Sequence, residues 1–186
     1  MRRLALVVMA GALGGAGCSS PMPIDEYASE LSDIAEAYVV ESQDLSYDYQ
    51  SSVEDGVRDI VEAGQDGAES DAIELVRSET VQYLAMLSDA MGRYLEQLDA
   101  LNPPDEVADQ HEAYVAAVRN VYESIPDARD TVAGATSLEG VQLALTASGF
   151  ADGQLRWTTT CLSLEEAVEA QGEPVTLRCV RSTPEQ

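Results

Sequence analysis

The fold is decided by "AIELVRSETVQYLAMLSDAMGRYLEQLDALNPPDE", residues 72–106. Apolar residues recur there every three or four positions, which is the spacing of one face of an α-helix, over about eight turns. Pro103 and Pro104 cannot continue that helix, whereas Asp105 and Glu106 suit the positive end of a following one. The stretch predicts a long amphipathic helix that turns tightly into an antiparallel neighbour. The stripe consists of Ile73, Val76, Thr80, Leu84, Leu87, Met91, Leu95, Leu98 and Leu101.

The same helical spacing extends to both sides of this stretch. A first helix is expected over residues 24–61, with a kink or break around Ser51 and Ser52. A third helix is expected over residues 107–132, kinked or interrupted at Pro126.

A fourth helical region is expected from about residue 138 to Gly172, with bends at Gly149 and Gly153. The segment after it forms either a lone short strand or no regular structure. We therefore predict one all-α domain over residues 24–186, an up-and-down bundle of about four helices with a short C-terminal tail.

The N-terminus has the layout of a secretory signal peptide. Two arginines precede an apolar run over residues 4–13, which is too short to span a bilayer. The stretch "GALGGAGCSSP", residues 11–21, then places small residues directly before Cys18. These resemble the lipobox of bacterial lipoproteins, although Gly15 stands where that motif has a large apolar residue.

The lipobox resemblance implies that residues 1–17 are a cleaved signal peptide and that the Cys18 thiol carries a diacylglycerol. Residues 18–23 would then form an extended, unstructured tether. Lipidation predicts a protein anchored to the cell membrane on its extracytoplasmic face, with the membrane itself as a partner. The alternative is an ordinary cleavage site, which would leave a secreted protein with a free thiol.

The cysteine count bears on the same question. The chain has three cysteines, and an exported protein with an odd number needs an explanation for the unpaired one. If Cys18 carries lipid, Cys161 and Cys179 are left as a pair in an oxidising compartment, where a disulfide persists. Such a bridge would staple the tail to the last helix and stabilise the domain by roughly 3 kcal/mol. The competing interpretation is two separate buried thiols.

The composition is strongly acidic. The chain has 34 acidic and 10 basic residues, a net charge of −24, and none of the basic residues is a lysine. The electrostatic potential of so acidic a chain repels nucleic acid, so no nucleic-acid partner is expected. The acidity reflects either a coding bias, with or without adaptation to high salt, or a selected acidic function.

Few residues have the reactivity that catalysis needs. His111 is the single histidine, so no histidine-rich metal site can form, and no Gly-x-Ser-x-Gly elbow is present. Residues 62–74 do not match the register of an EF-hand loop. No enzymatic activity, metal or cofactor is expected.

His111 and the tyrosines are the remaining candidates. His111 lies on an apolar helix face, which predicts a partly buried ring bonded to a backbone carbonyl or a carboxylate; the alternative is a ligand contact. The eight tyrosines fall mostly on or beside the helix stripes. They are expected in the core and at its rim, and the alternative is an aromatic-lined ligand groove.

Two stretches resemble small helical bacterial lipoproteins of unknown function. One is "LNPPDEVADQHEAYVAAV", residues 101–118, and the other is "CLSLEEAVEAQGEPVTLRC", residues 161–179. This resemblance implies a helical fold and an envelope location but no activity. The expected function is a non-enzymatic lipoprotein that binds an envelope protein or ligand. The alternative is a helical bundle that binds a metal or small ligand through His111 and nearby carboxylates.

Overall fold

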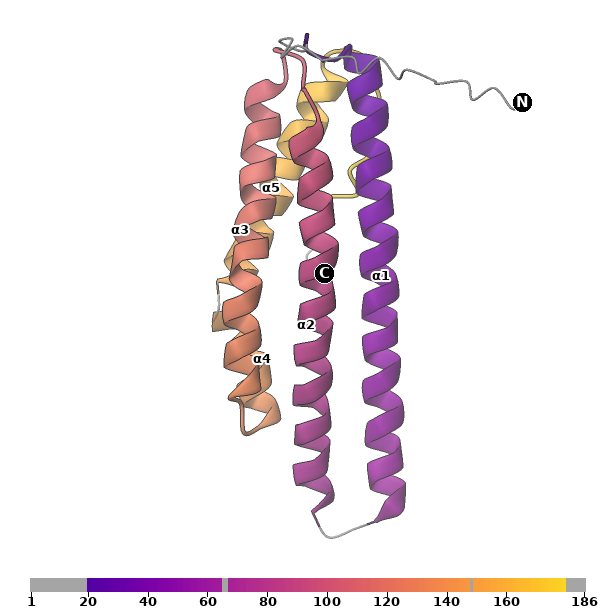
Figure 1. The fold of residues 1–186 in the computed structure, drawn as a ribbon, viewed down its shortest axis with the longest axis vertical. Helices are drawn as coiled ribbons and strands as arrows, with labels where there is room; N and C mark the ends of the chain where they lie inside the picture. The colour runs from indigo at the N-terminus through magenta and orange to yellow at the C-terminus, as the bar shows by residue number, and fades with distance from the viewer. Residues whose placement is uncertain (1–19, 65–66, 148, 180–186) are drawn as a thin grey trace, which may run out of the picture.

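A computed structural model describes residues 20–64, 67–147 and 149–179. Five α-helices make up this part of the chain, and no β-strand occurs in it. The predicted all-α, up-and-down bundle is confirmed, with the last two helices sharing the fourth position (Figure 1). The helices are α1 (Ile24–Ala63), α2 (Ala68–Ala100), α3 (Ala108–Ala133), α4 (Leu138–Ala147) and α5 (Phe150–Glu169).

Helices α1 and α2 form a long antiparallel hairpin (Figure 1). The expected kink or break around Ser51 and Ser52 is wrong, because α1 is one continuous helix of 40 residues. Serine lowers helix propensity by only a few tenths of a kcal/mol, and packing of α1 against α2 outweighs that cost. Gly56 shows how close the packing is: a Cβ there would lie 2.5 Å from the Leu75 side chain.

The predicted turn between α2 and α3 is confirmed, and α3 begins at Ala108 after the two prolines. Pro126 does not end α3, which continues to Ala133. Ile125 and Ala128 on either side of the proline are almost fully buried, at 1% and 0% exposure. Burial of these two side chains stabilises the helix and compensates for the backbone hydrogen bond that Pro126 cannot make.

Gly149 separates α4 from α5. The helical region therefore breaks at this glycine, where the sequence predicts only a bend. Its φ of 77° lies in the left-handed region, which glycine adopts without steric cost. Gly153 instead lies inside α5, where it allows a close approach to α3. A Cβ at Gly153 would stand 3.1 Å from Cγ2 of Val121.

The C-terminal tail after Gly172 lies between α1 and α5, without strand structure as far as residue 179 (Figure 1). The backbone N–H of Thr176 donates to Ser32 of α1 at 3.2 Å, and that of Leu177 donates to Glu165 of α5 at 2.8 Å. The predicted disulfide between Cys161 and Cys179 is present. The tail therefore bridges two helices that do not otherwise pack closely against each other.

The residues before α1 correct part of the tether prediction. Residues 1–17, Cys18 and Ser19 lie outside the described residues. Beyond them, the backbone N–H of Met22 donates to the Asn102 carbonyl at 3.0 Å, and the Asn102 side chain donates to the Ser20 carbonyl at 2.8 Å. Residues 20–23 are thus docked on the α2–α3 turn, at the end of the bundle where the tail also begins (Figure 1).

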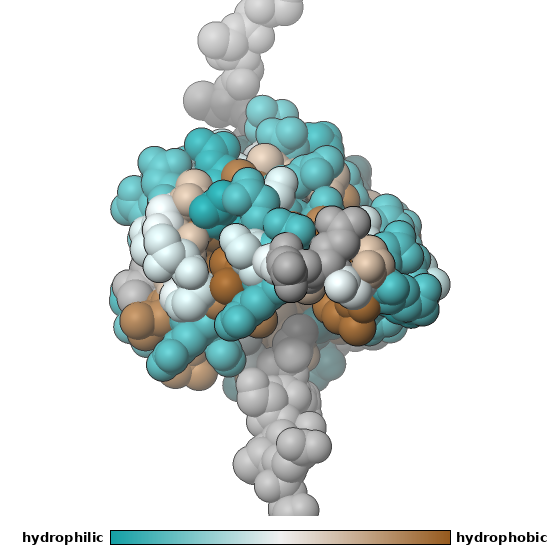
Figure 2. Space-filling model, turned by 90° about the horizontal axis from the view of Figure 1, so that it is seen from below, coloured by the Kyte–Doolittle hydropathy of each residue, from teal (hydrophilic) through white to brown (hydrophobic). Residues whose placement is uncertain are grey.

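The described surface at one end of the bundle is mainly hydrophilic. Seen from the end that carries the α1–α2 turn, hydrophobic side chains form only small separate patches among hydrophilic ones (Figure 2). No described helix combines the length and apolar character that crossing a bilayer requires.

Candidate functional site

A cleft of about 410 Å³ opens beside the tail, where α1 faces α4 and α5 across α2. This volume lies within the range of small-molecule sites, roughly 300–1,000 Å³. On α1 the cleft begins at Tyr38, two residues beyond Glu36, which pairs with Arg178 of the tail. It is lined by Tyr38, Ser42, Gln43, Ser46 and Tyr49 of α1, by Thr80, Tyr83, Leu84, Leu87 and Met91 of α2, and by Val121, Leu145, Phe150, Gln154 and Trp157 of the other helices.

None of these lining residues carries a formal charge. That composition is unusual for this chain, in which 24% of all residues are Asp, Glu, Lys or Arg. The walls are aromatic and aliphatic, and the polar groups among them are neutral hydroxyls and amides. The cleft is therefore chemically distinct from the acidic surface around it.

Hydroxyl pairs form one wall of the cleft. Thr80 donates its single hydroxyl proton to the Val76 carbonyl at 2.7 Å, so the Tyr49 hydroxyl must be the donor in its 2.9 Å bond to Thr80. The Tyr49 oxygen can therefore still accept a hydrogen bond. Ser46 and Tyr83 form a second pair at 3.3 Å, in which one hydroxyl keeps its proton for another partner.

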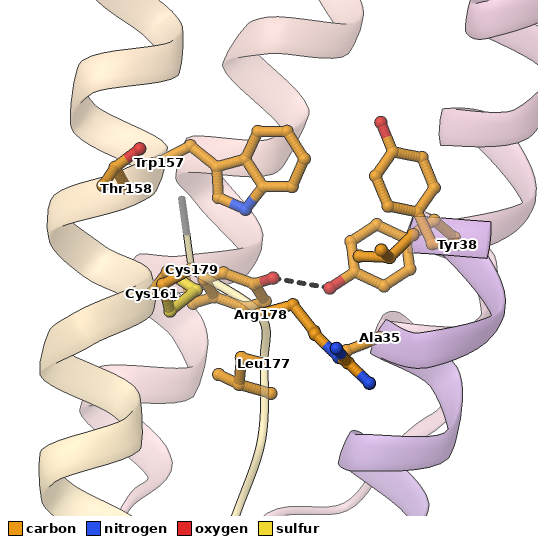
Figure 3. A pocket seen from close by; sticks show the side chains of 11 residues that line it. Ala35, Tyr38, Trp157, Thr158, Cys161, Leu177, Arg178 and Cys179 are labelled. Atoms are coloured by element: carbon orange, nitrogen blue, oxygen red, sulfur yellow. Dashed lines mark hydrogen bonds between the residues drawn. A yellow bond between two sulfur atoms is a disulfide. The ribbon is translucent and has the colours of Figure 1, made fainter. Parts of the chain in front are cut away.

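Tyr38 and Trp157 form the end wall next to the tail, with ring centroids 5.8 Å apart. Both also line a smaller cavity of about 60 Å³ beneath tail residues Leu177 and Cys179 (Figure 3). Both rings thus lie between the cleft and the smaller cavity. The disulfide and Leu177 of the tail also line that cavity.

Behind this wall lies a buried aromatic network. Tyr38 stacks on Tyr94 with centroids 4.5 Å apart, and the Tyr94 and Tyr114 hydroxyls hydrogen-bond to each other (dashed in Figure 3). The Trp157 indole N–H donates to Tyr114. Each of these three side chains therefore has a hydrogen-bond partner inside the protein, and one hydroxyl of the Tyr94–Tyr114 pair keeps its proton.

Burial keeps these tyrosines protonated. It raises the pKa of Tyr38, Tyr94 and Tyr114 above the ordinary value of a tyrosine, because a phenolate would lose its hydration. None of the three can act as a base near neutral pH. Their role in this site is to provide rings and neutral hydroxyls.

His111 lies at the other end of the bundle from the α1–α2 turn and does not line the cleft. Its side chain is 7% exposed, as expected for a residue on an apolar face. Its Nδ1 hydrogen-bonds the Tyr27 hydroxyl at 2.9 Å, and the ring also bonds the backbone of Leu98. The backbone partner agrees with the prediction, whereas Tyr27 was not anticipated.

Acidification should destabilise the domain through His111. Burial lowers its pKa below the 6.5 of a free histidine, so the unfolded chain takes up the proton first as the pH falls. Stability is then fully present above about pH 6.5 and is lost below it. Urea unfolding from about pH 8 to about pH 5 should show a larger loss for the wild type than for His111→Gln. Equal losses in both proteins would contradict this assignment.

The other predicted site residues are scattered. Cys161 and Cys179 form the bridge beside the smaller cavity, and Cys18 is outside the described residues. Within the described part of the chain, no group of three or more His, Cys, Asp or Glu side chains is arranged to hold a metal ion. His111 and the cleft are therefore separate features.

A residue pattern on α1 indicates the cleft, although it differs from the apolar period that predicts the helices. Tyr38, Ser42, Ser46 and Tyr49 recur at intervals of four, four and three on α1. Small hydroxyl residues between aromatics on a buried helix face leave space there, because serine cannot fill the volume of a core residue. The pattern is hard to recognise in the sequence, because tyrosines are frequent on the other helices as well.

Comparisons with protein-family models, with curated proteins and with solved structures find no match for this chain. The resemblance to small helical lipoproteins therefore stays a prediction.

Proposed function

We propose that this chain is an extracytoplasmic lipoprotein without enzymatic activity, anchored to the cell membrane through Cys18, that binds a ligand in the cleft. The observation that carries the binding role is the uncharged, aromatic-lined cleft of about 410 Å³ in a chain of net charge −24. Sites for small molecules combine such apolar walls with a few convergent polar groups.

The docked tether supports a defined placement of this cleft. Ser20 is bonded to Asn102, so only one residue separates Cys18 from a fixed point of the bundle. Ser46, in the middle of the cleft, lies 22 residues beyond Ile24 on α1, which corresponds to roughly 30 Å at a rise of about 1.5 Å per residue. A lipid on Cys18 would hold the cleft away from the membrane surface, open to the extracytoplasmic space.

The chemistry of the described side chains supports binding rather than catalysis. The buried tyrosines are held in the protonated state, and the pKa of His111 is lowered by burial. His111 hydrogen-bonds Tyr27 and the backbone of Leu98, away from the cleft. General acid–base catalysis needs a titrating group within reach of the bound molecule. The only ionisable groups among the described lining residues of the cleft are tyrosine hydroxyls, and burial holds that of Tyr38 in the protonated state.

The anchor is tested by Cys18→Ala. The variant should leave the membrane fraction and appear in the soluble exported fraction, because a protein without its acyl chains loses its hydrophobic anchor. Detergent-phase partitioning of both proteins is the measurement. Continued partitioning of the variant into the detergent phase would rule out Cys18 as the anchor.

Binding is tested by purifying the protein from its own envelope and analysing co-purified molecules by mass spectrometry. Ser42→Phe is the blocking variant, because a phenylalanine there projects into the cleft. Ser52→Phe is the matched control, an exposed serine on the same helix outside the cleft. A bound molecule should be lost from the first variant and retained by the second. Equal retention by both would contradict binding in the cleft.

A further inference from the structure

We infer that the cleft takes a neutral, mainly apolar ligand with a flat ring and a hydrogen-bond donor, a hydroxyl or an N–H. This inference rests on the proposed binding function and adds the chemical class of the ligand. Three features of the cleft carry it: the lack of charge along its walls, the arrangement of its rings, and the direction of its internal hydrogen bonds.

Charge decides between ligand classes. A charged group that enters the cleft would lose its hydration, and no wall residue of opposite sign is there to replace it. Burying an unpaired charge costs far more free energy than burying an apolar group of the same size. An anion meets a further penalty from the net charge of −24. A neutral ligand avoids both costs.

The rings favour a flat apolar partner over a cation. Cation–π recognition requires ring faces turned toward the ligand. Here Tyr38 is stacked on Tyr94, and the Tyr49 and Tyr83 rings pack on each other with centroids 5.1 Å apart. One face of each of these rings is thereby used inside the protein. What remains is a set of tilted apolar surfaces, which suits stacking and edge contacts with a ring.

The internal hydrogen bonds show which polar contacts the wall hydroxyls offer to a ligand. Ser42 donates to the Val39 carbonyl at 3.0 Å and Tyr49 donates to Thr80, so both oxygens face the ligand as acceptors. One hydroxyl of the Ser46–Tyr83 pair keeps a donor proton. The Ser42 and Tyr49 oxygens therefore offer acceptors that a hydroxyl or an N–H of the ligand can satisfy, beside the amide groups of Gln43 and Gln154.

Trp157 provides a direct readout, because it is the only tryptophan in the chain and lines the cleft. Two fluorescent probes of nearly equal size separate the ligand classes. N-phenyl-1-naphthylamine is neutral and carries one N–H, whereas 8-anilino-1-naphthalenesulfonate adds a sulfonate. Both are titrated into the full chain carrying Cys18→Ala, without detergent, while Trp157 emission is recorded.

The neutral probe should quench Trp157 and saturate at one site, and the anionic probe should bind at least about tenfold more weakly. The preference should persist in about 1 M sodium chloride, which screens long-range repulsion beyond roughly 3 Å but supplies no partner inside the cleft. Ser42→Phe should weaken the neutral probe by at least about tenfold, because a phenylalanine occupies space that the probe needs, and Ser52→Phe should not.

A second pair of variants protects the test against misfolding. Gln154→Phe fills the cleft from an exposed position of α5, and Gln142→Phe is its exposed control on α4. Circular dichroism and thermal melting confirm that each variant is folded. Loss of binding in Gln154→Phe but not in Gln142→Phe repeats the expected result.

Failure of the inference and failure of the proposed function give different results. Equal binding of both probes at high salt, with both lost in Ser42→Phe, overturns the neutral ligand class and leaves binding in the cleft intact. Stronger binding of a tetraalkylammonium ion than of the neutral probe also overturns it. Binding of the neutral probe that neither cleft-filling variant weakens overturns the site itself, and the proposed function with it.

Discussion

Replacing Tyr114 with alanine is expected to lower the free energy of unfolding by about 3–5 kcal/mol, the range for truncating a large buried aromatic side chain. The side chain is 1% exposed and lies among α1, α2 and α5 at the centre of the bundle. Its removal leaves a cavity and deprives the Tyr94 hydroxyl and the Trp157 indole of a partner. Small domains have only about 5–15 kcal/mol of stability in total, so the variant should be marginally folded.

Tyr114→Phe separates the two contributions. It keeps the ring and removes only the hydroxyl, so it should cost about 1–3 kcal/mol, the penalty for leaving buried polar groups unsatisfied. Tyr47→Ala is the control, because Tyr47 is 73% exposed and its loss should change stability by less than about 0.5 kcal/mol. Urea unfolding followed by circular dichroism measures all three. A loss for Tyr114→Ala no larger than for Tyr47→Ala would refute the buried network.

Removal of the disulfide, by Cys161→Ser with Cys179→Ser, is expected to cost roughly 3 kcal/mol in the chain-entropy model. The bridge closes a loop between cysteines 18 positions apart. Without it the tail is held by Val175 and Leu177, which are 7% and 4% exposed, and by the hydrogen bonds to Ser32 and Glu165. Those contacts must then offset the full conformational entropy of the segment.

Hydrogen exchange locates this effect. The amides of Thr176 and Leu177 should exchange faster in the double variant, whereas core amides of α2 should change only in proportion to global stability. Cys18→Ala is the matched control, a cysteine substitution outside the bridge that should leave the unfolding midpoint unchanged. An unchanged midpoint with protected tail amides in the double variant would mean that the noncovalent contacts alone hold the tail.

Local patterns were sufficient to predict the helices and the bridge. The apolar stripe from Ile73 to Leu101 predicts a helix face regardless of what that face packs against, because the 3.6-residue period is a property of the helical backbone itself. The two prolines after it stop that helix because proline lacks the amide proton that a helix needs. The pairing of Cys161 with Cys179 needed only a count of cysteines and a compartment, and the disulfide is present.

Features that depend on packing were predicted poorly. Propensity suggested a kink or break around Ser51 and Ser52 and a kink or interruption at Pro126. Neither position ends its helix, since burial against neighbouring helices outweighs a local cost of that size. The tether was expected to be unstructured, and Asn102, some 80 residues away in the sequence, binds it. No local pattern encodes such a partner.

The candidate site shows the same division. From the sequence alone, the acidic composition argued against a nucleic-acid partner, the tyrosines allowed an aromatic-lined groove as the second interpretation, and the cysteines placed the tail near α5. Only the tertiary structure decided that Ser42 and Tyr49 of α1 face Trp157 of α5 across an uncharged cleft. The physical reason is that a cleft is space left between helices, and its volume depends on how five helices and a tail pack together rather than on the period of any one of them.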